Sequence, residues 1–274
     1  MKVLIFGDVV AKPGRKAIRE LLPKWKEKYQ PDLVIANAEN LSHGIGATPA
    51  SVKELQDAGV DFFTSGNHIW KKTDVMTLLT QNPPILLRPV NYPPGLPGSG
   101  ERLLRLGVRQ VLVINLMGRV FFKETLDCPF RAIDEVLTRY HLSTDTPRSQ
   151  ASQPVDGILV DFHAEASSEK NALGRYVDGK VTAFWGTHTH VPSGDSMTLK
   201  NGTAYRNDIG MTGLKDSVIG ANTESVIQQF LTQTGHPAMH DVSDSGEVIV
   251  NGQILEFEGK QITQWNMLQE SIVV

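Results

Sequence analysis

Two histidines separated by a single residue form the most chemically suggestive pattern in this sequence. His188 and His190 come directly after the apolar run 181–185, whose β-branched and aromatic residues predict a strand. Since side chains two positions apart point the same way in an extended chain, both imidazoles are expected to face one point or two adjacent points. Imidazole is the commonest protein ligand for metal ions, so the pair is a candidate metal site. The alternative is a pair of histidines that only lines a loop.

Other apolar runs also end in an acid, an amide or a histidine. The runs 3–6 and 33–36 predict buried strands, and 62–64 and 157–162 predict two further strands. Ligands of open α/β sheets bind outside the carboxyl ends of the strands, which favours one shared site. The side chains delivered to such ends are Asp8, Glu39, Asn40, Asn67, His68 and His163.

The elements that must position these residues follow from the apolar spacing and the turn residues. The first 68 residues predict strand–helix–strand–helix–strand, with helices over 15–29 and 48–58 and a chain break at Pro13-Gly14. Asn201-Gly202 and Asn251-Gly252 each predict a hairpin turn. Further predictions are paired strands over 103–106 and 111–115, helices over 129–140, 167–175 and 223–234, and loops over 143–154 and 207–213.

Composition excludes several classes of function. The chain has 274 residues, of which 40% are hydrophobic and 21% charged, and this balance is typical of a globular protein. A net charge of −3 without a basic run argues against tight binding of duplex nucleic acid, but leaves a small nucleotide substrate open. Cys128 is the only cysteine, so any metal must take nitrogen and oxygen ligands. With no signal-peptide core and no apolar stretch of ~18 residues, we expect a cytoplasmic protein without a membrane partner.

The strand-end residues contain enough ligands for two metal ions. Two ions about 3.5–4 Å apart need a bridging carboxylate, and Glu39 has two oxygens to offer. A hydroxide between the ions would be a nucleophile at neutral pH, which suits in-line hydrolysis at phosphorus. One ion would be held by Asp8, Glu39, Asn40 and His190, and the other by Glu39, Asn67, His163 and His188.

These motifs resemble a known enzyme family along nearly the whole chain. Gly7-Asp8, Gly66-Asn67-His68 and Gly186-x-His188-x-His190 resemble the signature blocks of the calcineurin-like metallophosphoesterases. Within that family the YmdB-type bacterial branch is the most similar, because Val10 stands where most members have a histidine. The segments that resemble this branch are Gly7-Asp8-Val9-Val10, Asn37-Ala38-Glu39-Asn40, Asp161-Phe162-His163-Ala164-Glu165 and Asp208-Ile209-Gly210-Met211-Thr212-Gly213.

The resemblance implies a fold, a metal pair and a reaction. The fold would be a four-layer αββα sandwich with two mixed β-sheets, formed by residues 1–274 as a single domain. Two divalent or mixed-valence ions, iron or manganese, would be bound, with Asn40 replacing the ligand that is missing at Val10. His68 would be the general acid for the leaving group. The substrates would be phosphodiesters, including cyclic nucleotides.

Three functions follow from this reading. The leading hypothesis is a metal-dependent phosphodiesterase that hydrolyses small phosphodiesters or nucleotides. One alternative is a metal-bound nucleotide-sensing regulatory protein with little turnover, and another is an RNA-cleaving phosphodiesterase. Asp208 is either a partner of the site or a turn residue. Assembly into a homo-oligomer stays open.

Overall fold

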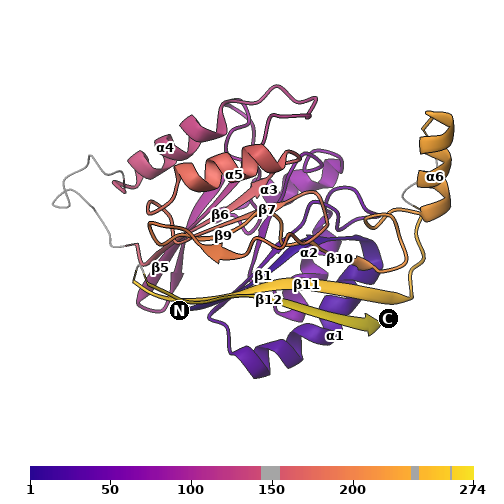
Figure 1. The fold of residues 1–274 in the computed structure, drawn as a ribbon, viewed down its shortest axis with the longest axis horizontal. Helices are drawn as coiled ribbons and strands as arrows, with labels where there is room; N and C mark the ends of the chain where they lie inside the picture. The colour runs from indigo at the N-terminus through magenta and orange to yellow at the C-terminus, as the bar shows by residue number, and fades with distance from the viewer. Residues whose placement is uncertain (143–154, 236–240, 260) are drawn as a thin grey trace.

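Two six-stranded sheets form the centre of the molecule, with helices on their outer faces (Figure 1). The computed structural model describes residues 1–142, 155–235, 241–259 and 261–274. Both sheets mix parallel and antiparallel pairs, as predicted. Sheet A contains, in spatial order, β12 (Gln261–Val273), β11 (Glu247–Glu258), β10 (Met211–Leu214), β1 (Lys2–Val9), β2 (Leu33–Asn37) and β3 (Phe62–Thr64). Sheet B contains β4 (Glu101–Leu106), β5 (Arg109–Met117), β6 (Gly157–His163), β7 (Ala183–Thr187), β9 (Ala204–Arg206) and β8 (Met197–Thr198).

The helices complete a four-layer arrangement. In Figure 1, α4 (Pro129–Arg139) and α5 (Ser167–Tyr176) lie above sheet B, and α1 (Ala11–Tyr29) lies below sheet A. The helix α2 (Pro49–Ala58) packs with α1, while α6 (Thr223–Thr232) projects from the body. A short 3-10 helix (Thr73–Val75) leads into α3 (Met76–Leu79). The αββα prediction is confirmed. No helix in the described part of the chain is long and apolar enough to cross a bilayer.

Strand β1 shows why the apolar runs are continuous. Leu4 and Phe6 belong to the core between sheet A and its helices, whereas Val3 and Ile5 belong to the core between the two sheets. The Phe6 ring stacks on Trp25 of α1 with ring centroids 5.5 Å apart. Because alternate side chains of a strand point to opposite faces, burial of both faces requires apolar residues at every position.

Strand β1 also changes its neighbour along its length. Residues 2–6 pair antiparallel with β11, whereas Asp8 and Val9 pair parallel with Met211 and Thr212 of β10. Gly7 lies at the change, where a Cβ atom would stand 1.9 Å from the Gly210 carbonyl oxygen. Only glycine allows this close approach, and the approach brings Asp8 to the end of the strand.

The hairpin predicted at Asn251-Gly252 is wrong. β11 runs without a turn from Glu247 to Glu258, and it pairs with β12 along its whole length. Gly252 is there for packing, since a Cβ atom at this position would lie 3.0 Å from the Trp25 ring. A glycine inside a strand can mark such a close approach instead of a turn.

Three other element boundaries differ from the prediction, and one prediction falls outside the described residues. Pro13 does not break the chain but lies in the first turn of α1, where its missing N–H costs nothing. Residues 211–214 form β10 instead of a loop, because β1 and β11 pair with them on either side. Helix α6 ends at Thr232 and is capped by Asn222, whose side chain accepts a hydrogen bond from the Ser225 N–H. The loop predicted over 143–154 lies outside the described residues.

Candidate active site

The carboxyl ends of five strands meet at one edge of the sandwich. β1, β2 and β3 run parallel in sheet A, and β6 and β7 run parallel in sheet B. The segments that follow these strands carry the predicted polar residues, and the contacts among those residues cross from one sheet to the other. The structure brings together Asp8, Glu39, Asn40, Asn67, His68, His163, His188 and His190.

His163 is the centre of this cluster. Its Nδ1 atom lies 3.8 Å from Asp8 Oδ1, and its Nε2 atom lies 3.7 Å from Glu39 Oε1. The same Nε2 atom is 3.2 Å from Asn67 Oδ1 and 3.1 Å from His188 Nδ1. The predicted second ligand set, Glu39 with Asn67, His163 and His188, is therefore contiguous in space.

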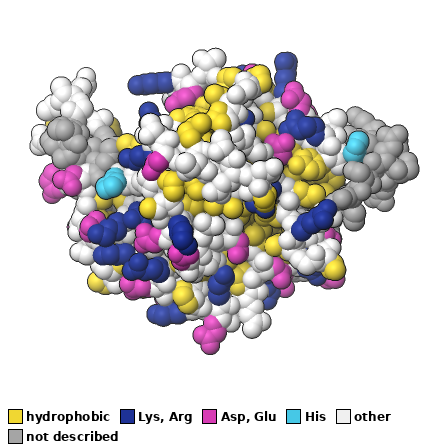
Figure 2. Space-filling view, turned by 180° about the vertical axis from the view of Figure 1, so that it is seen from behind, with side chains coloured by type: hydrophobic (Ala, Val, Ile, Leu, Met, Phe, Trp, Pro, Cys, Tyr) yellow, Lys and Arg dark blue, Asp and Glu magenta, His cyan; other side chains and the backbone are white. Residues whose placement is uncertain are grey.

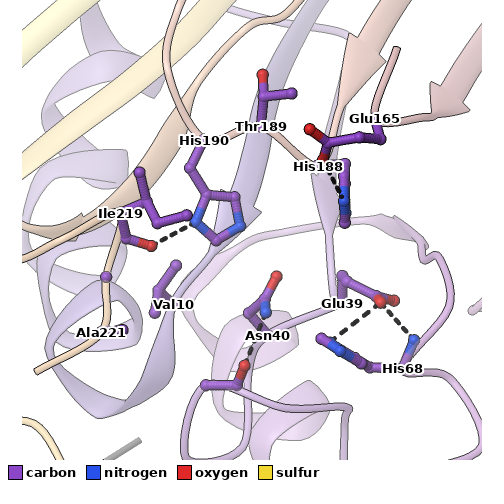
Figure 3. A pocket seen from close by; sticks show the side chains of 12 residues that line it. Val10, Glu39, Asn40, His68, Glu165, His188, Thr189, His190, Ile219 and Ala221 are labelled. Carbon is purple, nitrogen blue, oxygen red and sulfur yellow. Dashed lines mark hydrogen bonds and ion pairs between the residues drawn. The ribbon is translucent and has the colours of Figure 1, made fainter. Parts of the chain in front are cut away.

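The second group gathers around Asp8. His190 Nε2 lies 3.8 Å from Asp8 Oδ1, and Asp8 Oδ2 accepts a hydrogen bond from the His188 backbone N–H at 3.0 Å. Asn40 binds the Gly44 carbonyl through its Nδ2 atom at 2.7 Å, which leaves its Oδ1 atom for another partner. A cavity of about 290 Å³ is lined by Glu39, Asn40, His68, His188 and His190, as Figure 3 shows.

The segment that carries His188 and His190 is a strained turn. Both residues have left-handed backbone conformations, with φ of 96° and 65°. The predicted extended geometry is therefore wrong: β7 ends at Thr187, and the two imidazoles face two adjacent points. Such strain persists only where the surroundings enforce it.

Asp208 holds this turn. Its Oδ2 atom accepts hydrogen bonds from the Thr189 hydroxyl at 2.7 Å and from the Thr189 N–H at 3.2 Å. Lys170 of α5 donates to the same oxygen at 2.7 Å, and both charged groups are buried. From the sequence, Asp208 could be either a partner of the site or a turn residue. In the structure it binds Thr189, the residue between the two histidines.

Each imidazole has an oxygen partner on the side away from the cluster. His190 Nδ1 lies 2.6 Å from the Ile219 carbonyl, which can only accept, so Nδ1 carries the proton and Nε2 has a lone pair. His188 Nε2 likewise lies 3.0 Å from Glu165, which leaves the His188 Nδ1 lone pair facing the cluster. Metal-bound histidines typically donate their second N–H in this way.

The third imidazole is oriented by a buried hydroxyl. Thr187 Oγ1 donates to Asp161 at 2.8 Å, so it accepts from His163 Nδ1 at 3.0 Å and leaves a lone pair on His163 Nε2. That lone pair faces the one on His188 Nδ1 across 3.1 Å. Two nitrogen lone pairs at this distance repel each other, and a cation between or beside them would relieve the repulsion.

Burial disfavours the charged form of two acids and two imidazoles in the cluster. It raises the pKa of Asp8 and raises the pKa of Glu39 well above its ordinary value. Burial also lowers the pKa of His163 well below its ordinary value and lowers the pKa of His188 to about 4. The His163 and His188 imidazoles therefore favour the neutral form and are poor counter-charges for the carboxylates beside them.

These donors match a metal pair in kind. Buried Asp8 Oδ1 and Asn40 Oδ1 have no hydrogen-bond partner, although buried polar atoms are nearly always paired. Carboxylate, amide and imidazole donors without thiolate suit iron or manganese. Within the described ranges, no three or more His, Cys, Asp or Glu side chains are already placed to hold an ion, so the donors would have to close further around it.

Two supporting residues were not assigned a role from the sequence. Asp161 of β6 is fully buried, accepts from Asn37 Nδ2 at 3.0 Å and from Thr64, and thereby joins the two sheets behind His163. Glu165 pairs with His188 and lines the cavity (Figure 3). The signal was present for both residues, since an acid lies two positions before His163 and another lies two positions after it.

Comparison with known proteins places these observations in a family context. A family model described as YmdB-like protein matches residues 4–268. A 2′,3′-cyclic-nucleotide 2′-phosphodiesterase of Bacillus subtilis (strain 168) is 39% identical over 258 residues, which are 94% of this chain and 92% of that protein. The crystal structure of a novel phosphatase from Mycoplasma pneumoniae is 34% identical, with a TM-score of 0.87 over 100% of this chain and 93% of that one. The calcineurin-like phosphoesterase YfkN of Bacillus subtilis is 10% identical and shares the fold alone, with a TM-score of 0.56 over 99% of this chain and 90% of that one.

Proposed function

The chain belongs to the YmdB-like family of calcineurin-like metallophosphoesterases, and from this premise we propose that it hydrolyses small phosphodiesters, 2′,3′-cyclic nucleotides among them. The observation that carries the proposal is the cluster of inward-facing lone pairs on His163, His188 and His190 beside the partnerless oxygens of Asp8 and Asn40. Such a donor set favours a pair of divalent ions at the cavity floor. The small substrate fits the B. subtilis relative, whose name specifies a cyclic nucleotide.

The roles of the residues follow from their places in the cluster. In the proposed site, Asp8, Glu39, Asn40, Asn67, His163, His188 and His190 hold two ions, with iron or manganese favoured by the donor types. The ions would supply charge neutralisation at phosphorus and a water of lowered pKa. Glu39 is the proposed bridge between the two ions. Its carboxylate is held in place because its two oxygens accept hydrogen bonds from the backbone N–H groups of Gly66 and His68.

His68 is the residue best placed to move a proton to the leaving group. It is half-buried at the cavity wall, and its Nδ1 atom lies 3.3 Å from Glu39 Oε1. This contact orients the imidazole at the edge of the cluster without using it as one of the seven proposed ligands. A general acid at this edge can protonate a departing ribose oxygen as the P–O bond breaks.

Two other functions are less well supported. A nucleotide sensor without turnover would have no use for His68 beside the complete ligand set. Cleavage of long RNA would need a basic track for the phosphates, but acidic and basic side chains are interspersed over the face that Figure 2 shows. The net charge of −3 points the same way.

The decisive experiment measures metal content and turnover on the same preparation. Protein purified without chelators is expected to hold about two ions per chain, and to hydrolyse adenosine 2′,3′-cyclic phosphate with added Mn²⁺. A chelator should abolish turnover, and Mn²⁺ or Fe²⁺ should restore it. His141→Ala is a control outside the site, and it should behave as wild type.

Each contrary result has its own meaning. Full activity with at most one ion after saturation would overturn the two-metal site. Tight binding of the cyclic nucleotide without turnover would favour the sensor. Faster cleavage of an RNA oligomer than of any small diester would favour the RNA-cleaving enzyme.

A further inference from the structure

A second cavity opens beside the one at the ligand cluster. Its volume is about 460 Å³, and His68, Glu165 and His188 line both cavities. The two spaces are therefore neighbours across the proposed general acid. Any group attached to the oxygen that His68 protonates would extend toward this second space. None of the seven predicted ligands other than Asn67 and His188 lines it.

The outer wall of this cavity carries an aromatic side chain that the core does not use. Phe121 lines the cavity, and 84% of its surface is exposed. Its backbone has a φ of 68°, in the left-handed region that is costly for a bulky residue. Neither the exposure nor the strain helps the fold, and strained residues of this kind cluster at ligand sites.

The loop that presents Phe121 is fixed on both sides. Before it, Glu169 of α5 accepts the backbone N–H groups of Arg119 and Val120 at 3.0 and 3.2 Å. After it, the Phe122 ring packs on the His188 imidazole with centroids 4.9 Å apart. The backbone that carries Phe121 is thus fixed beside the ligand cluster, while the Phe121 ring itself stays exposed to a ligand.

Two lysines add positive charge to the same wall. Lys71 follows the His68 segment and Lys123 follows the phenylalanines, and neither forms an ion pair with a described residue. Of the two acids on this wall, Glu165 is paired with His188, which leaves Glu124 as the opposing charge. An exposed aromatic ring with basic neighbours is the combination that binds a nucleobase and a backbone phosphate.

We propose that this cavity is the nucleoside subsite, in which the base of the substrate stacks on Phe121 and a further phosphate of the same nucleotide binds Lys71 and Lys123. The inference rests on the proposed phosphodiesterase function and specifies its substrate. The preferred substrate is a nucleoside 2′,3′-cyclic phosphate that carries a 5′-phosphate. Phe121 and the lysines are specificity-determining residues, whereas the ligand cluster performs the reaction at phosphorus.

The test compares two substrates with the same reacting ring. Adenosine 2′,3′-cyclic phosphate carries a base, whereas glycerol 1,2-cyclic phosphate does not. Phe121→Ala should raise KM for the adenosine compound by roughly 5- to 150-fold, the range of base–aromatic stacking, with kcat and the glycerol compound little changed. Phe121→Trp should retain the wild-type KM. Phe230→Ala is the matched control, because Phe230 lies on α6 and is 80% exposed.

A second comparison tests the lysines. Wild type should prefer the adenosine substrate that bears a 5′-phosphate, and Lys71→Ala with Lys123→Ala should remove that preference without changing kinetics on the unphosphorylated compound. Lys200→Ala, at an exposed turn, is the control. A preference that survives in the double variant would overturn the assignment of the lysines.

The outcomes separate this inference from the proposed function. Equal losses on the adenosine and glycerol compounds, or no loss on either, would overturn the subsite while leaving the phosphodiesterase intact. If wild type hydrolyses no diester, the affinity of adenosine 3′-phosphate for the Mn²⁺-loaded protein, measured by calorimetry, still tests the subsite. A weaker affinity in Phe121→Ala alone supports the subsite, and equal affinities in wild type and Phe121→Ala refute it.

Discussion

The two sheets bring different chemistry to the edge that they share. Sheet A ends in the acids Asp8 and Glu39 and in amides, whereas sheet B ends in the imidazoles of His163, His188 and His190. Burial favours the neutral form in both halves: it raises the pKa of the acids and lowers the pKa of His163 and His188. Each half is thereby driven toward its neutral form.

The different side chains of the two sheets explain how a buried site could still bind metal ions. The lowered pKa values of His163 and His188 make these two imidazoles poor counter-charges for ionised Asp8 and Glu39. In the proposed site, a bound cation would stabilise the ionised form of both acids. The supports also differ. Glu39 is held by backbone N–H groups, whereas each imidazole is held by an oxygen on its far side. Substitutions at the sheet A residues and at the sheet B residues should therefore have different effects on metal binding and activity.

Removing charge from the sheet A half should give the largest effect. Glu39→Gln preserves shape but replaces one carboxylate oxygen by an NH₂ group, which then faces the N–H of either Gly66 or His68. Because Glu39 is the proposed bridge, both ions should be lost and activity should fall by more than the ~10²–10⁴-fold that a general acid provides. Elemental analysis and turnover check this, with Asn40→Ala, expected to disturb one ion, as the comparison. Two ions at wild-type rate in Glu39→Gln would show that the bridge is misassigned.

His68 is an exception to the pattern of acids and amides on sheet A and imidazoles on sheet B, because it is an imidazole that follows a sheet A strand. His68→Ala should lose ~10²–10⁴-fold in kcat/KM on a cyclic nucleotide, whose alkoxide leaves poorly. On bis(p-nitrophenyl) phosphate, whose leaving group needs no proton, the loss should be far smaller. Metal content should stay at the wild-type level. Equal losses on both substrates with full metal would assign His68 to phosphate binding, and lost metal would place it among the ligands.

The sheet B half can be tested through the orientation of its imidazoles. Thr187→Val removes the hydroxyl between His163 and Asp161 while keeping the volume. Metal affinity should fall by roughly 10–100-fold, the usual cost of losing a partner that orients a ligand. Thr187→Ser, which keeps the hydroxyl, should retain the metal affinity of the wild type. Equal affinities in the valine and serine variants would mean that the hydroxyl does not orient His163.

The last expected effect changes stability and not activity: it is a pair of opposite pH dependences in the metal-free protein. Burial raises the pKa of Asp161 from 3.8 to about 7, so between these values the folded state keeps a proton that the unfolded state has lost. Stability from Asp161 therefore falls as pH rises through this window. The pKa of His188 is lowered from 6.5 to about 4, so stability from His188 rises with pH between these values.

Urea denaturation at several pH values can separate the two dependences. Relative to wild type, Asp161→Asn should gain up to about 3 kcal/mol between pH 5 and pH 7, because it removes a group that opposes folding as pH rises. His188→Asn should shift the other way, with less stability gained over the same interval. Shifts of the same sign in both variants would contradict the opposite response of acids and imidazoles to burial.

The strand ends could be predicted from the sequence because their cause is local. A strand buried on both faces is mostly apolar, so the polar residues near the end of each run mark the edge where Asp8, Glu39 and His163 emerge. The hairpin at Asn201-Gly202 was found for the same reason, as its turn residues lie between β8 and β9.

What could not be predicted depends on contacts between distant segments. Gly252 has the local signal of a turn, but it is fixed in a strand by Trp25, more than two hundred positions earlier. The left-handed conformations of His188 and His190 are held by Asp208. The exposure of Phe121 has no local signal, since an apolar residue between apolar neighbours suggests burial.

The change of neighbour along β1 determines when the site can form during synthesis. Among the strands in the described ranges, β2 is the one partner of β1 that follows closely in the chain, whereas Asp8 pairs with Met211 and Lys2 pairs with Glu256. Pairings across such separations are slow to form and leave the strand edge unprotected until then. A nascent chain therefore carries Asp8 on an incomplete strand until nearly all of it has left the ribosome. If the proposed metal site is correct, ion binding by the full ligand set should be among the last events of folding, after β10 and β11 have paired with β1.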